Sequence, residues 1–259
     1  MTPARKLTLT AIPGLPEVKP GDDLAALITA AVEENGLTVE DDDIFVLAQK
    51  IVSKSEGRLV NLNTVQPSPR AQEIAQIVQK RPELVELILQ ESNAVLRARP
   101  GVLIVEHKSG FVCANAGIDH SNVSGAWGDP ADWVLLLPED SDRSAQVIRT
   151  GLEAHFGKRL GVLIIDSYGR AWRNGIIGMS IGLSGMPALV DMRGKPDRNG
   201  YRMRVTVIAA ADELAAGASL MMGQAAEGTP VVLAQGFPYE LVEDQACRLV
   251  RSKQTDLFR

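Results

Sequence analysis

The residues best suited to chemistry stand in one short stretch around residue 166. An apolar run, residues 161–165, is followed at once by Asp166 and Ser167, and then by Arg170 and Arg173. Carboxylate and hydroxyl oxygens are hard ligands for a divalent cation, and guanidinium groups bind phosphate or carboxylate. Rigid scaffolds present functional residues where strands end. The stretch therefore predicts a site for phosphoryl transfer, where cations neutralise the charge that develops.

A second acidic segment precedes this stretch in the chain. Asp119 offers a metal ligand, and Asn122 offers a partner for a phosphate or ribose oxygen. Asp, Ser and Asn also form Asx turns readily, so a purely structural turn is the alternative. Because Asp119 and Asp166 are far apart in the sequence, only the fold can join them. Once joined, two such carboxylates can hold two cations across a phosphate chain.

Three other polar segments have both a functional and a structural interpretation. Residues 49–58 carry lysines near a strand end, which suit phosphate contacts or a solvated basic turn. Residues 222–230 join a helix to the last strand. Their backbone groups suit a nucleotide, with Gln224 or Glu227 in reach of a metal, and a helix cap with a turn is the alternative. Residues 191–200 predict a charged hairpin turn whose acids pair with neighbouring arginines.

The common signatures of other sites are absent from the sequence. It has neither a Gly-x-x-x-x-Gly-Lys-Ser/Thr loop nor a Gly-x-Gly-x-x-Gly turn, so a nucleotide would bind by another construction. The three histidines share no spacing that suits a zinc site or a Ser-His-Asp arrangement. Phosphoryl transfer at an oxygen-ligated metal therefore remains the leading hypothesis.

Composition limits the class of protein. The 259 residues, 45% of them hydrophobic, suffice for one large domain or two small ones. A net charge of −5 disfavours nucleic acid, and the apolar stretches are far shorter than the roughly 20 residues that span a bilayer. We expect free buried thiols at Cys113 and Cys247 and packing roles for Trp127, Trp133 and Trp172. With no signal-like N-terminus, the sequence predicts a cytoplasmic protein that binds neither nucleic acid nor membrane.

Strands and helices are predicted to alternate irregularly around these segments. Without a strict βαβ repeat, the pattern predicts an α+β fold of mixed sheets with flanking helices. The five glycines within residues 175–194 indicate close backbone approaches or an interlocked segment. The expected strands are 7–12, 44–48, 95–98, 102–105, 111–117, 133–137, 161–165, 202–209 and 231–234. The expected helices are one capped by Asp22, then 68–79, 82–90, 141–156 with its cap at Ser141, and 211–222.

The order of the motifs resembles one known family. The resemblance rests on Gly14-Leu15-Pro16, Lys54, Glu56-Gly57-Arg58, Gly117-Ile118-Asp119, Ser121-Asn122, Leu136-Leu137-Pro138-Glu139-Asp140, Asp166-Ser167, Gly169-Arg170, Trp172-Arg173, Asp191-Met192-Arg193-Gly194, Ala211-Asp212-Glu213-Leu214-Ala215 and Met222-Gly223-Gln224. In this order the motifs resemble the coenzyme F420-0:L-glutamate ligases, the γ-glutamyl ligases that elongate the deazaflavin coenzyme F420. The resemblance extends over nearly the whole chain, from about residue 7 to residue 236.

The resemblance implies a function and a set of site residues. It implies a bipartite γ-glutamyl ligase fold in an intertwined homodimer, and a GTP-dependent ligase that adds L-glutamate to the lactyl phosphate carboxylate of coenzyme F420-0. The implied cations are two of manganese or magnesium, with potassium as a further one. The metal ligands by position are Asp119, Asp166, Ser167 and Gln224. The GTP contacts by position are Leu15, Pro16, Glu17, Val18, Gln49, Lys54, Asn122, Met222, Gly223, Gln224, Ala225, Ala226, Glu227, Gly228 and Thr229.

Our own reading of the residues adds Arg170 and Arg173 to Asp119 and Asp166 as catalytic groups that bind anions. The chain departs from the family pattern at Gln224, where an acid often stands. Residues 1–259 are expected to form a single ligase domain, with two subdomains at most and without a fused nitroreductase-like domain. The alternatives are another metal-dependent nucleotide hydrolase, a ligase for a different acid and amino acid, or a non-catalytic regulatory module on the same fold.

Overall fold

A five-stranded mixed sheet forms the centre of the computed structural model, which describes residues 4–123, 125 and 128–257. Its strands, in spatial order, are β1 (Thr8–Ala11), β12 (Val231–Gln235), β2 (Ile44–Ala48), β8 (Gly161–Arg170) and β9 (Arg173–Ser184). All neighbours pair antiparallel except β2 and β8, which run parallel. Parallel strands need a crossover connection, and here the whole of residues 49–160 lies between the two.

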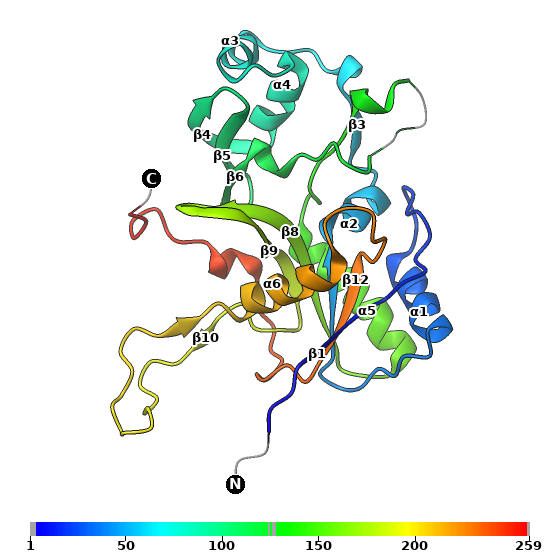
Figure 1. Ribbon diagram of the computed structural model, residues 1–259, viewed down its shortest axis with the longest axis vertical. Coiled ribbons are helices and arrows are strands. Elements are labelled where there is room, and N and C mark those ends of the chain that lie inside the picture. The colour runs from blue at the N-terminus through cyan, green and yellow to red at the C-terminus, as the bar shows by residue number, and fades with distance from the viewer. Residues whose placement is uncertain (1–3, 124, 126–127, 258–259) are drawn as a thin grey trace.

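Helices cover both faces of this sheet (Figure 1). On one face lie α1 (Leu24–Glu34) and α5 (Ser141–Phe156), and on the other lies α6 (Ala210–Met222). The central strand β2 has the sequence Ile-Phe-Val-Leu-Ala, and its successive side chains point to opposite faces of the sheet. Phe45 and Leu47 enter the core beneath α1 and α5, whereas Ile44 and Val46 enter the core beneath α6. A continuous apolar run is typical of a strand that is buried on both faces.

A second lobe stands beyond one end of the sheet (Figure 1). It contains α3 (Pro69–Val78), α4 (Pro82–Gln90) and a sheet of β4 (Ser92–Arg99), β5 (Val102–His107) and β6 (Val112–Ala114). The short ladder of β3 (Leu59–Asn61) and β7 (Trp133–Leu135) connects it to α2 (Gln49–Ser55). Short 3-10 turns occupy Leu62–Thr64, Asn115–Gly117, Pro130–Asp132 and Ala246–Leu249. One buried core runs from the α1–α5 layer into this lobe.

An arm projects from the opposite side of the sheet layer. It consists of β10 (Val190–Asp191), β11 (Val207–Ile208) and the long connection between them (Figure 1). The predicted turn at residues 191–200 is confirmed, and Asp191 pairs with Arg193 at 2.6 Å. The predicted strand at residues 202–209 is wrong: only Val207 and Ile208 form a ladder, because little else packs on the arm to hold an extended partner.

The structure confirms the α+β class and most of the predicted elements. Three keep the predicted bounds: β2, α4 and α5. The predicted caps are wrong by one residue, since Asp23 caps α1 and Asp140 caps α5. Residues 111–117 are extended only in part, because β6 gives way to a turn with positive φ at Asn115 and Ala116.

The predicted roles of the cysteines and tryptophans hold only in part. Cys113 is a free buried thiol, but Cys247 is exposed. Trp133 packs over Gly125. Trp172 stands at the tip of the β8–β9 hairpin with 81% of its surface exposed, so it is no core residue. Trp127 lies outside the described residues. Within the described chain, no helix combines the length and apolar character that crossing a membrane requires.

Glycines let β9 approach its covering helices closely. A Cβ atom at Gly178 would lie 2.5 Å from the carbonyl oxygen of Ala215 in α6, and one at Gly182 would lie 2.4 Å from Cβ of Ser141 in α5. The glycine-rich segment therefore marks close backbone approaches within the chain, as the sequence predicted.

Gly178→Ala is expected to lower the free energy of unfolding by about 1–3 kcal/mol, because the added methyl group must displace helix backbone. The matched control is Gly169→Ala on the paired strand, where an added Cβ meets no heavy atom within 4 Å and φ is not positive. Urea unfolding followed by circular dichroism measures both. Equal transition midpoints for the two variants would contradict the close contact between β9 and α6.

Candidate active site

The pairing between the two parallel strands of the central sheet ends at one edge, where β2 stops. The prediction that the other strand also ends at residue 165 is wrong, because β8 continues to Arg170 in its pairing with β9. Ala48, the last residue of β2, pairs with Ile165 of β8. Helix α2 begins directly after β2, so Gln49 and Lys50 emerge beside Asp166. Functional groups collect outside the carboxyl ends of parallel strands because the chain leaves the sheet there. This edge therefore gathers polar groups from two distant parts of the sequence.

Asp119 reaches the same edge from the second lobe. Its backbone forms a bridge with Leu135, with N···O distances of 3.0 and 2.9 Å, which fixes the loop that carries it. The side-chain amide of Gln49 donates to Oδ2 of Asp119 over 2.7 Å. The hydroxyl of Ser53 donates to Oε1 of Gln49 over 2.8 Å and so sets the orientation of that amide. Gln49 is only 1% exposed.

The pKa values of both carboxyl groups are raised. Burial, and then the charge of Asp119, raise the pKa of Asp166 to about 7, while Lys50 and Gln49 act in the opposite direction. Burial also raises the pKa of Asp119, against the effect of Lys50, whose Nζ lies 3.6 Å from Oδ2. Two acids whose ionised forms repel in a desolvated place attract a cation strongly.

Ser167 and Gln224 complete a set of oxygen donors. The hydroxyl of Ser167 donates to Oε1 of Gln224 over 2.9 Å, which joins the end of β8 to the loop after α6. In the described part of the chain, no group of three or more His, Cys, Asp or Glu residues could hold a metal. A cation at this edge would therefore rely on the carboxylates of Asp119 and Asp166 with neutral oxygens beside them. An all-oxygen set fits magnesium or manganese.

A cavity of about 370 Å³ lies on one side of this edge. All fifteen residues predicted to contact GTP line it, although they come from four separate parts of the sequence. The amide of Asn122 lies 3.4 Å from the carbonyl oxygen of Ala225, which closes the cavity's rim. Lys54 pairs with Glu17 at 3.7 Å, so its ammonium group is held at the wall. Their contact with a nucleotide stays a prediction.

The carboxylate of Glu227 binds the backbone of its own loop rather than the residues proposed to hold a metal. Its carboxylate accepts the backbone N–H of Ala225 over 2.8 Å, and backbone hydrogen bonds of its own loop hold its pKa below the ordinary value. Of the two acceptor side chains that the sequence offered in this loop, Gln224 is the one that meets Ser167. At least one backbone N–H of the loop, that of Ala225, therefore already donates to Glu227.

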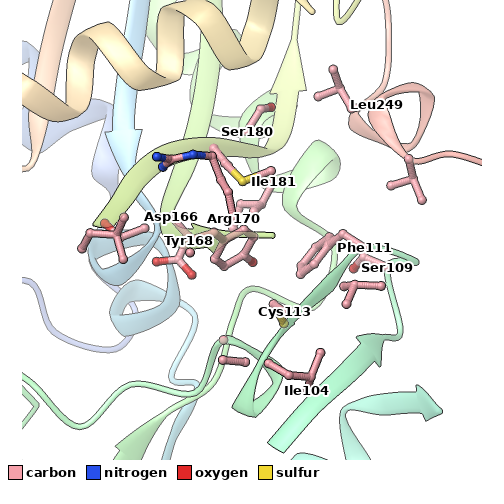
Figure 2. Close-up of a pocket in the computed structure, with 18 of the residues that line it drawn as sticks. Ile104, Ser109, Phe111, Cys113, Asp166, Tyr168, Arg170, Ser180, Ile181 and Leu249 are labelled. Atoms are coloured by element: carbon pink, nitrogen blue, oxygen red, sulfur yellow. The ribbon is translucent and has the colours of Figure 1, made fainter. Parts of the chain in front are cut away.

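A larger cavity of about 1380 Å³ lies on the other side, between β8–β9 and the second lobe (Figure 2). Asp166, Ser167, Lys50 and Gln224 line both cavities. The catalytic candidates Arg170 and Arg173 line only the larger one, as do Arg97, Arg99 and Arg251. Asp166 therefore stands between the two cavities, the larger of which is rich in arginine, whereas Asp119 lines only the larger one.

An aromatic wall borders the larger cavity. The ring of Phe111 lies 5.4 Å from that of Tyr168 and 4.9 Å from that of His107. Burial lowers the pKa of His107 to about 4, so it is neutral at physiological pH. Burial raises the pKa of the Cys113 thiol to about 12, and Cys113 is therefore no nucleophile at neutral pH. These side chains are thus uncharged at neutral pH, and their rings suit a reaction from which water must be kept.

Sequence reasoning missed some groups of the site. Lys50 belongs to the segment whose lysines were predicted to suit phosphate contacts, but the sequence did not predict that it faces a carboxylate. It donates to Oγ of Ser121 over 2.7 Å and faces Asp119. No sequence signal identified Phe111 or Tyr168, because their places depend on how the second lobe folds over β8.

Known proteins of one family are similar to this chain over most of its length. Residues 14–236 match the family described as F420-0:Gamma-glutamyl ligase. The chain is 41% identical over 257 residues to the coenzyme F420:L-glutamate ligase of Methanopyrus kandleri, covering 98% of each chain. It is 42% identical over 255 residues to that of Methanothermobacter thermautotrophicus, covering 98% of this chain and 99% of the relative. It is 41% identical over 248 residues to that of Archaeoglobus fulgidus, covering 96% and 94%. The chain therefore belongs to the F420-0:γ-glutamyl ligase family.

Proposed function

We propose that this protein is a GTP-dependent ligase that attaches L-glutamate, in γ linkage after the first addition, to the lactyl phosphate carboxylate of the coenzyme F420 precursor. The observation that carries the proposal is the position of Asp166 and Ser167, which line both cavities. A ligase driven by a nucleotide must bring a phosphate chain and an acid together across a short gap. The names of the curated relatives support L-glutamate and coenzyme F420 as reactants.

The smaller cavity is the proposed GTP site. Its walls combine the Leu15–Val18 turn, the start of α2 and the glycine-containing loop at residues 222–229. Lys50, near Asp119, and Lys54 place two ammonium groups at this cavity, and phosphates are well bound by such point charges.

Asp119, Asp166, Ser167 and Gln224 are the proposed ligands for two divalent cations, manganese or magnesium, with potassium as a further cation. Their oxygen donors fit such ions, and Gln224 replaces an acid with a neutral oxygen. When bound, the divalent cations neutralise the phosphate chain and the transferring group.

The proposed reaction has two steps. In the first, a carboxylate oxygen of the precursor attacks the γ-phosphorus of GTP, the bond to the β-phosphate oxygen breaks, and GDP leaves with an acyl phosphate formed. In the second, the glutamate amine attacks the acyl carbon, phosphate leaves, and the amine proton passes to solvent or base. Lys50 holds positive charge beside Asp119 during both steps. Phe111 and Tyr168 keep an apolar wall beside the acyl group, which limits its hydrolysis.

The arm is the proposed dimer contact. It exposes Tyr201, Val205 and Val207, with Val205 86% exposed, far from the rest of the core. A two-stranded projection with little packing of its own gains stability when a second copy covers it. An intertwined homodimer that works in the cytoplasm is the proposed state. A nucleotide hydrolase or a ligase for another acid would use the same edge, and the assay below separates them.

Asp166→Ala is expected to abolish glutamate ligation while the protein stays folded, because the substitution removes one carboxylate of the proposed metal pair. The assay combines GTP, manganese, the coenzyme precursor and L-glutamate, and measures phosphate release beside product mass. The wild type should require both acceptors and yield products heavier by glutamyl units. Glu73→Gln, an exposed change on α3, is the control. Phosphate release without either acceptor would identify a hydrolase, and full activity of folded Asp166→Ala would remove Asp166 from the mechanism.

The affinity of the nucleotide-free protein for Mn²⁺ should rise with pH up to about 7 and then level off. The pKa of Asp166 is raised to about 7, so below that pH the metal must displace a proton, which weakens binding by about tenfold per pH unit. The free Mn²⁺ signal in electron paramagnetic resonance measures the affinity from pH 5 to 8. Asp166→Asn should bind weakly and lose this dependence, and Glu73→Gln should keep it. A wild-type affinity that is constant from pH 5 to 7 would contradict the assignment.

Val205→Asp on the arm should convert the proposed dimer into a monomer, since a charge replaces an exposed apolar side chain in the contact. Light scattering coupled to size exclusion measures the mass. Val147→Asp, an exposed valine on α5, is the matched control and should stay dimeric. A monomeric wild type, or two variants of equal mass distribution, would refute the arm as the contact.

A further inference from the structure

Three buried polar atoms of residues that line the larger cavity have no hydrogen-bond partner among the described residues: the phenol oxygen of Tyr168, Nη1 of Arg170 and Oγ of Ser180. Tyr168 and Arg170 lie on β8, whereas Ser180 lies on β9. Tyr168 as a whole is 7% exposed. A buried donor without an acceptor is costly, the more so when it carries charge, and such groups are rare in native proteins. A ligand that brings acceptor oxygens would satisfy the two donors on β8, Tyr168 and Arg170.

Tyr168 and Arg170 lie on the side of the site where the coenzyme precursor and L-glutamate are proposed to bind. Asp166, Tyr168 and Arg170 alternate along β8, and residues two apart in a strand share a face and stand about 6–7 Å apart. Figure 2 shows these three residues on the β8 side of the cavity, across from Phe111 and Cys113. Neither Tyr168 nor Arg170 lines the smaller cavity. The two donors therefore lie beyond the carboxylate pair, on the side away from the proposed nucleotide.

The guanidinium of Arg170 and the phenol of Tyr168 together suit a carboxylate as their ligand. A guanidinium and a neutral phenol offer one positive charge and N–H and O–H donors, which match the charge and the oxygens of one carboxylate. The other guanidinium nitrogen, Nη2, lies 3.5 Å from the carbonyl oxygen of Asn174, which steadies the group. The ring of Phe111, 5.4 Å from Tyr168, supplies an apolar surface for methylene groups beside the carboxylate. A short acidic amino acid has both parts.

We propose that Arg170 and Tyr168 form the subsite that binds a carboxylate of the incoming L-glutamate. The inference rests on the proposed ligase function and adds the place of the amino acid to it. With its carboxylate held there, the amine of the amino acid points back along β8 toward Asp166, where the acyl carbon is expected. Both donor atoms lie beneath the cavity surface, so the ligand must first turn the Arg170 side chain, a motion that long side chains make rapidly.

The test separates the three substrates kinetically. Tyr168→Phe and Arg170→Lys each remove hydrogen-bonding capacity with little change of volume, and Arg170→Lys also retains the charge while it loses the planar fork. Each variant should raise the KM for L-glutamate about tenfold, while the KM values for GTP and for the coenzyme precursor change less than about twofold. Tyr239→Phe and the exposed Arg143→Lys are the matched controls and should match the wild type. Circular dichroism confirms folding, and Arg170→Gln replaces Arg170→Lys if the latter does not fold.

Each outcome has one meaning. A selective rise for L-glutamate supports the subsite. A rise confined to the precursor assigns these donors to the carboxylate of the other substrate and overturns the proposal, as do unchanged KM values. If the wild type shows no turnover that depends on glutamate, the proposed ligase function fails separately. In that case titration calorimetry with L-glutamate decides the subsite: binding that Tyr168→Phe and Arg170→Lys weaken supports it, and binding that is absent or unchanged overturns it.

Discussion

The site depends on two carboxylates that must stay close in a place from which water is largely removed. Burial raises the pKa of both Asp119 and Asp166, and the charge of Asp119 raises the pKa of Asp166 further. The fold compensates with Lys50 and with the amide of Gln49, which Ser53 orients from within α2. Because α2 starts directly where β2 ends, the parallel pairing of β2 with β8 places this compensation beside Asp166. The mixed topology of the sheet is therefore part of the electrostatics of the site.

The two lobes are necessary for the same reason. Asp166 belongs to the central sheet, whereas Asp119 belongs to a loop that the second lobe anchors through its bridge to Leu135. The two carboxylates meet only when both lobes are folded, so the site cannot form in either part alone. Close packing makes this assembly rigid, and the buried core that runs between the lobes keeps the two acids in register.

Much of this could be predicted from the sequence, and the reason for each failure is physical. The apolar run of β2 and the proline that begins α4 act locally, so their elements were predicted at the observed bounds. The strand predicted at residues 202–209 failed because β propensity needs a partner surface that the arm lacks. Asp119, Asp166, Ser167 and Gln224 were recognisable from polar residues after apolar runs and from resemblance. Tyr168 and Phe111 were not, because an aromatic residue in a strand looks the same whether it fills a core or walls a cavity.

One strand serves several parts of the proposed chemistry, and this limits what the site can accept. Asp166 and Ser167 stand where β8 leaves the sheet centre, and Arg170 lies four residues after Asp166 in the same strand. A strand rises about 3.3 Å per residue, so the span from Asp166 to Arg170 is set at about 13 Å by backbone geometry. Regular pairing with β9 from Asp166 to Gly169 restrains most of this span, and an irregularity in the ladder separates Gly169 from Arg170. The nucleotide cavity, by contrast, is built largely from loops. The acceptor side therefore has the more rigid geometry, and selection among acids and amino acids by length is expected to arise there rather than at the nucleotide.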